Sequence, residues 1–215
     1  LGFLLIPLYT FYLSPEDYGI IALLALLIAF INPIIMAPLS NGFGRYYHHK
    51  EYQGKQKVLL FNVIIFVFIQ SLIVALLFYV FSVSIAEILF SNSRFNHLIE
   101  LYCIVILFNP LVKIQGSSFR IQKKAQEFVI INLVTILGTA FVTIYLLVIT
   151  ALGFMAVIYG AIFSIIFQFV LGLPHLFKSI EFKFQPQVLY IPFNYGYPLI
   201  LSSFSGTLIS LSDRY

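Results

Sequence analysis

Apolar runs of about 20 residues alternate with short polar segments along the whole chain. A bilayer core about 30 Å thick needs about that many residues as an α-helix, so each run is expected to cross a membrane. The 50 residues from Phe128 to Phe177 carry no charge. They would extend about 75 Å as one helix, so we expect a turn at 150–153 to divide them. The expected spans are 1–13, 18–44, 58–81, 98–119, 128–149, 153–175 and 192–215.

The polar segments between these runs are short. Ser14 to Asp17 is expected to form a loop, because proline ends helices and favours turns. Residues 82–97 are expected to form a connector, and residues 176–191 the last polar loop. The chain opens inside an apolar run with no basic segment or cleavage site before it. We therefore expect a fragment of a longer protein rather than a signal peptide at this end.

Composition agrees with a membrane protein. The chain of 215 residues is 61% hydrophobic and 9% charged, with a mean hydropathy of +1.01. Soluble domains carry roughly 25% charged residues. The net charge of +4 is spread over short loops, so we expect a lipid bilayer and no nucleic acid as a partner. The fold class expected is an all-α, polytopic integral membrane protein.

The basic residues are concentrated in alternate polar segments. Three segments, 45–57, 120–127 and 175–191, together hold nine Lys and Arg residues. The other three segments, 14–17, 82–97 and 149–153, hold only one such residue, Arg94. Loops rich in Lys and Arg face the cytoplasm, so these three segments are predicted to be cytoplasmic, as is the N-terminus.

The last expected span has one polar face. At 100° per residue, four polar residues fall within a narrow arc and two more residues flank it. The arc holds Ser203, Thr207, Ser210 and Arg214, and the flanking residues are Gly206 and Asp213. Charged residues within a span usually face a protein interior or a water-filled cavity, so this helix is expected to line a polar path. Alternatively, Arg214 marks the outer end of the helix beside Asp213.

The fourth expected span has a second polar face. Asn109, Lys113, Gly116 and Arg120 share one side of the helix by the same arithmetic. Together with the last span, this face predicts a cavity of hydroxyls, amides and cations with few acids. Such a cavity suits a polar anionic cargo such as a sugar phosphate. The alternative for Lys113 is that it reaches into the lipid headgroups as an anchor.

Small residues recur every fourth position in the sixth expected span. They lie in the series Ala156, Gly160, Ser164, Gln168 and Gly172. This spacing usually means close helix packing, which we favour there over a ligand site. No spacing in the sequence is typical of a catalytic set, so no catalytic residue, metal or cofactor is expected.

Three short motifs carry a resemblance to a known family. They are Leu13–Gly19 (LSPEDYG), Arg45–Tyr47 (RYY), and Gly196–Ile200 (GYPLI) followed by Ser210–Tyr215 (SLSDRY). With these motifs the chain resembles polysaccharide biosynthesis transporters, the O-antigen-type flippases of the multidrug/oligosaccharidyl-lipid/polysaccharide (MOP) exporter superfamily. The resemblance covers the whole chain, although members often have arginine where this chain has Phe11.

The resemblance implies two six-helix lobes around a central cavity. Residues 1–175 would be the amino-terminal lobe, 176–191 a cytoplasmic loop between lobes, and 192–215 the first helix of a second lobe. The implied cargo is an undecaprenyl-diphosphate-linked oligosaccharide moved across the bacterial inner membrane. Other membrane proteins of polysaccharide assembly are further expected partners.

Two other functions remain open at this point. A drug or cation exporter of the same superfamily would be expected to place acids, not bases, in the amino-terminal cavity. A membrane-embedded sugar polymerase or acyltransferase would need a large outer loop carrying His, Arg or Asp. We favour the lipid-linked saccharide transporter, which is not an enzyme.

Overall fold

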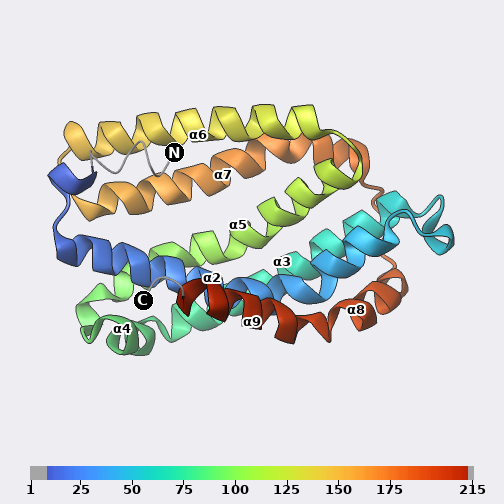
Figure 1. Cartoon of the computed structure of the whole chain (residues 1–215), viewed down its shortest axis with the longest axis horizontal. Helices are drawn as coiled ribbons and strands as arrows, with labels where there is room; N and C mark the ends of the chain where they lie inside the picture. The colour runs from blue at the N-terminus through green and yellow to red at the C-terminus, as the bar shows by residue number, and fades with distance from the viewer. Residues whose placement is uncertain (1–8, 213–215) are drawn as a thin grey trace.

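The computed structural model describes the backbone of residues 9–212, and their side chains except those at 37, 38 and 207–212. All regular structure in this part of the chain is helical (Figure 1). Among the described residues, five helices are long and apolar enough to cross a membrane. They are α2 (Pro15–Tyr46), α3 (Gln56–Val80), α5 (Asn96–Ile121), α6 (Ala125–Val148) and α7 (Phe154–Ser179). The predicted class, an all-α polytopic membrane protein, is confirmed.

Helix α2 begins three residues earlier than its apolar run. Ser14 is its N-cap: the Ser14 hydroxyl accepts from the Asp17 N–H (3.2 Å), and the Asp17 carboxylate accepts from the Ser14 N–H (2.9 Å). Pro15 follows at the first helical position, where its missing N–H costs nothing. The loop expected at Ser14–Asp17 is therefore wrong, because these residues cap and start the helix.

The expected connector at 82–97 also contains a helix, α4 (Ser82–Phe90). Ser82 and Ala86, one turn apart, are buried, whereas Ile88 is 81% exposed. Ser91 ends the helix in the left-handed conformation, with φ of 52°. The single 3₁₀ turn η2 (Ser93–Phe95) then leads into α5. Helix α4 is too short to cross a bilayer and packs at one end of the bundle.

The seventh expected span is divided. Helix α8 (Tyr190–Gly196) and helix α9 (Leu199–Ser212) replace the single helix expected over 192–215. Pro198 has no N–H to continue the hydrogen-bond ladder, and the Ile200 N–H instead donates to Tyr197 O in a tighter turn. The break also lets α8 and α9 both pack along α2.

The three basic segments meet at one end of the bundle (Figure 1). His48 Nε2 lies 3.1 Å from Ile121 O, which joins the first segment to the second. The Tyr52 hydroxyl donates to Val188 O in the 3₁₀ turn η3 (Pro186–Leu189), joining the first segment to the third. A short 3₁₀ turn, η1 (Lys50–Tyr52), supports Tyr52. The three basic segments therefore lie on the same side of the bundle, as the count of Lys and Arg in the loops predicts. The cytoplasmic orientation and the division into lobes stay predictions.

The core lies between α2, α3 and α5, whereas α6 is attached mainly to α7. Leu137 and Phe141 of α6 are 68% and 73% exposed, as expected for side chains that face lipid. Glycines bring other helices close together. A Cβ at Gly160 would overlap the Thr143 side chain of α6, and one at Gly172 would overlap the Gln115 carboxamide of α5. At these positions the small residues of α7 serve helix packing, as expected.

Candidate functional site

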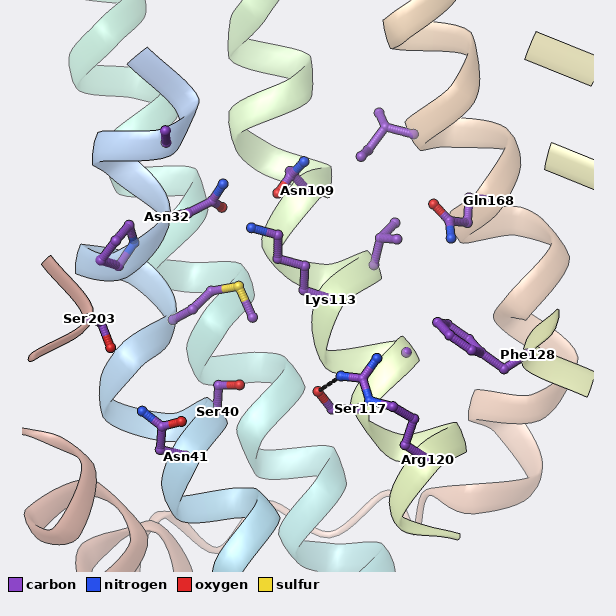
Figure 2. Close-up of a pocket in the computed structure, with 16 residues that line it drawn as sticks. Asn32, Ser40, Asn41, Asn109, Lys113, Ser117, Arg120, Phe128, Gln168 and Ser203 are labelled. Atoms are coloured by element: carbon purple, nitrogen blue, oxygen red, sulfur yellow. Dashed lines mark hydrogen bonds between the residues drawn. The ribbon is translucent and has the colours of Figure 1, made fainter. Parts of the chain in front are cut away.

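A cavity of about 690 Å³ lies between α2 on one side and α5 and α7 on the other (Figure 2). Helix α6 contributes Phe128 to its wall, and α9 contributes Ser203. The apolar lining comes from Ala29, Pro33, Met36, Val112, Gly116, Phe128 and Ile165. The polar lining comes from Asn32, Ser40, Asn41, Asn109, Lys113, Ser117, Arg120, Gln168 and Ser203.

The polar face of α5 forms one wall. Asn109, Lys113, Gly116 and Arg120 all line the cavity, on the face that helical spacing predicted. Lys113 extends from α5 towards α2 (Figure 2). The side-chain oxygen of Asn109 is buried and has no hydrogen-bond partner among the described residues. A buried amide oxygen without a partner is costly, so a rotation of this side chain that lets the oxygen meet water or a ligand group in the cavity would be favourable.

Arg120 is held in place by its neighbours. Its Nη2 donates to Ser117 Oγ at 3.0 Å, and its guanidinium carbon lies 5.6 Å from the centre of the Phe128 ring. Gly116 makes room for that ring, because a Cβ there would lie 3.0 Å from it. One guanidinium edge is therefore fixed by the protein while the side chain remains exposed to the cavity.

Gln168 of α7 belongs to the series of residues for which helix packing is expected, but it also lines the cavity. Its Nε2 donates to Asn132 Oδ1 of α6 at 2.9 Å, and Asn132 Nδ2 in turn donates to Phe128 O. The bond to Asn132 fixes the orientation of Gln168, so the amide offers a positioned polar group to the cavity.

Sequence reasoning missed the wall supplied by α2. Asn32, Ser40 and Asn41 lie in a span that carries no charge, so no charged residue marks their face in the sequence. Their signal was present: Asn32, Met36 and Ser40 recur every four residues and so share one helix face.

The charge in the cavity is positive. Lys113 and Arg120 are the charged residues among its described lining, which includes no Asp or Glu. The salt bridges recorded among the described residues involve His49, Lys124 and His175, so neither cavity cation is paired with a described carboxylate. Two unneutralised cations next to amides and hydroxyls favour an anion with polar groups attached.

The candidates of the last span are only partly described. Ser203 lies at the cavity. Thr207 and Ser210 belong to α9, but their side chains are outside the described ones. Asp213 and Arg214 lie outside the described residues. Their part in a polar path stays a prediction.

Comparison with protein families gives a match over nearly the whole chain. Residues 12–214 match the family described as polysaccharide biosynthesis protein. Neither the curated proteins nor the solved structures include a significant match. The matched range includes every helix from α2 to α9, and it agrees with the resemblance drawn from the three motifs. The chain therefore belongs to the polysaccharide biosynthesis protein family.

Proposed function

We propose that the protein moves an undecaprenyl-diphosphate-linked oligosaccharide across the bacterial inner membrane for the assembly of a surface polysaccharide of the O-antigen or capsule type. Membership of a polysaccharide biosynthesis family supports a saccharide cargo, and the five apolar helices of the described chain support a site within a bilayer. The proposal places the protein among the flippases of the MOP superfamily, where other membrane proteins of polysaccharide assembly are its expected neighbours.

The observation that carries the proposal is the chemistry of the cavity wall. Lys113 and Arg120 supply positive charge, and no carboxylate is among the described lining residues. A guanidinium donates two parallel hydrogen bonds to a phosphate, and an ammonium acts as a point charge beside it. Asn32, Asn109 and Gln168 offer amides that can hydrogen-bond sugar hydroxyls. The apolar tail of such a cargo can stay in the surrounding lipid.

The same wall argues against the other two functions. An exporter of cationic drugs needs negative charge to offset its cargo, whereas the charged lining residues here are basic. A polymerase or acyltransferase that worked in this cavity would need a general base there. The described lining residues include no His, Asp or Glu, the commonest general bases. We therefore propose a transporter rather than an enzyme.

Transport by the purified protein in liposomes tests this proposal. A fluorescent undecaprenyl-diphosphate oligosaccharide placed in one leaflet should become accessible in the other leaflet when the protein is present. Lys113→Met and Arg120→Gln should each slow this movement about tenfold or more, the scale of losing one charge-assisted hydrogen bond. Lys178→Met, an exposed change outside the cavity lining, is the matched control. Movement at the wild-type rate in both cavity variants would contradict the proposal.

A further inference from the structure

His175 is a buried histidine of α7 outside the cavity wall, with a side chain 3% exposed. Its ring stacks on Phe119 of α5, with centroids 3.7 Å apart and 17° between the planes. Its two nitrogens face different groups. Nε2 lies 3.1 Å from Ser118 Oγ, and Nδ1 lies 4.0 Å from Glu127 Oε2 of α6.

We assign the hydrogen positions in this cluster from the distances. The Ser118 hydroxyl lies 2.8 Å from Gln115 O and 3.1 Å from His175 Nε2, and its one hydrogen is assigned to the nearer acceptor, Gln115 O. In this assignment Ser118 accepts from His175, and Nε2 carries a hydrogen. In the neutral ring, Nδ1 is then left with a lone pair. That nitrogen is buried, has no hydrogen-bond partner among the described residues and faces a carboxylate.

We propose that His175 is a proton-binding site, which takes up one proton from the aqueous side on Nδ1 and then donates it in a hydrogen bond to Glu127. The lone pair of Nδ1 forms the new N–H bond, and no other bond breaks. The charged ring completes a hydrogen-bonded chain from Glu127 through His175 and Ser118 to Gln115. A hydrogen bond from the charged imidazole to the Glu127 carboxylate joins two charged groups and is therefore strong. The bound proton thus connects α6 to α7 and, through Ser118, to α5.

Two charged groups lie next to this site. Glu127 Oε2, 4.0 Å from Nδ1, attracts a proton bound there, whereas Lys124, at 3.8 Å from the other Glu127 oxygen, repels it. Ser118 and Phe119, the α5 groups in contact with the ring, are uncharged. Lys178, on α7 itself, is exposed to solvent.

The order of carboxylate, imidazole and hydroxyl is also that of a nucleophilic triad. Ser118 is fully buried, however, and its hydrogen is assigned to a carbonyl rather than to the imidazole. No substrate reaches this hydroxyl and no base activates it. The arrangement holds a proton instead of preparing a nucleophile.

The proton site is connected to the cavity through ring contacts. Glu127 directly precedes Phe128, whose ring lies 6.0 Å from that of Phe119 and 5.6 Å from the Arg120 guanidinium carbon. Drawing Glu127 towards His175 therefore acts on the residue against which Arg120 rests. The relevance of this link to cargo rests on the proposed function, whereas the proton site itself does not.

Nitrogen NMR of the histidine-labelled protein in lipid nanodiscs tests the site. The four histidines are assigned by single substitutions. Neutral His175 should carry its hydrogen on Nε2, and acid should add the second one on Nδ1. Glu127→Gln should raise the proton concentration needed for half-titration about tenfold. Lys124→Met should lower it, and Glu181→Gln, an exposed change on another segment, should leave it unchanged.

Hydrogen on Nδ1 in the neutral ring, or a titration unaltered by Glu127→Gln, would overturn the proton site. The guanidinium signals of Arg120 test the link to the cavity. They should shift at the same pH as His175 in the wild type and lose that shift in Glu127→Gln. If the Arg120 signals do not change as His175 titrates, the proposed link between the proton site and the cavity is wrong. No cargo is present in either measurement, so failure here is distinct from failure of the transport proposal.

Discussion

At the scale of single residues, Asn62 shows how a buried polar group can fix a distant segment. Asn62 is 1% exposed and lies on α3. Its Nδ2 donates to Val58 O and to Lys183 O, and its Oδ1 accepts from the Gln185 N–H. One amide therefore holds the segment between α7 and α8 against the bundle, although the sequence suggested only a polar loop there.

Asn62→Leu should release this segment. The change leaves Lys183 O and the Gln185 N–H without their partner, at about 1–3 kcal/mol for a buried group and less where water can enter. Hydrogen exchange at the Gln185 N–H should speed up by at least tenfold, while exchange within α6 stays unchanged. Gln53→Leu, at an exposed position, is the control. Unchanged exchange at Gln185 would show that Asn62 does not hold the segment.

The polar residues of the cavity were only partly predictable from the sequence. The face of Asn109, Lys113 and Arg120 could be found because a charge within an apolar run marks it and helical spacing extends it. Asn32 and Ser40 were not predicted to line the cavity, because neutral polar residues in a span are common and most face other helices. Gln168 was not predicted to line the cavity, because other members of its series, Gly160 and Gly172, do serve helix packing. Only the packed structure separates these cases.

At the scale of elements, Gly42 determines how closely α8 approaches α2. A Cβ at Gly42 would overlap the backbone of Pro192 in α8, whereas a Cβ at Gly44, two residues on, would meet nothing within 4 Å. These two glycines of one helix form a matched pair. The first allows contact between helices, and the second does not take part in it.

Gly42→Ala should therefore push α8 away and destabilise the protein by about 1–3 kcal/mol, the usual cost of overpacking. Gly44→Ala should be neutral or stabilising by up to about 1 kcal/mol, because alanine favours the helix. Thermal unfolding of the purified variants in detergent measures both. Equal effects of the two substitutions would contradict the close contact between α2 and α8.

The long helices were predictable because about 20 apolar residues leave few alternatives in a bilayer. Their ends were less so. Ser14, Pro15 and Asp17 were interpreted as a loop, although the same residues form a capping box that starts α2. Pro198 was assigned to the interior of a helix that it divides. Proline is compatible with both a helix start and a helix break, and the neighbouring packing decides between them.

At the scale of the whole molecule, the three basic segments contact one another at one end of the bundle. This arrangement places the opposite turns, before α2, at α4 and between α6 and α7, at the other end (Figure 1). A protein inserted by the positive-inside rule would expose the basic end to the cytoplasm.

Cysteine labelling in intact cells tests this orientation. In a background with Cys103→Ala, single cysteines at the exposed positions Gln53, Gln126 and Gln187 should react only after the cytoplasmic side is opened. A cysteine at the exposed Asn92 should react from outside. Gln122 is a poor site, because its side chain accepts from Ser179 Oγ. Labelling of a cysteine at position 126 by an impermeant reagent in intact cells would show that the predicted orientation is wrong.

The central claim is that the cavity binds the anionic linkage of a lipid-linked saccharide. Equilibrium binding to the protein in nanodiscs tests it most directly, with two lipids that carry the same saccharide on a diphosphate or on an uncharged linkage. The diphosphate lipid should bind at least tenfold more tightly. This preference should disappear in the Lys113→Met, Arg120→Gln double variant and persist in Lys178→Met. Equal affinity for the two lipids, or a preference that survives the double variant, would contradict the account.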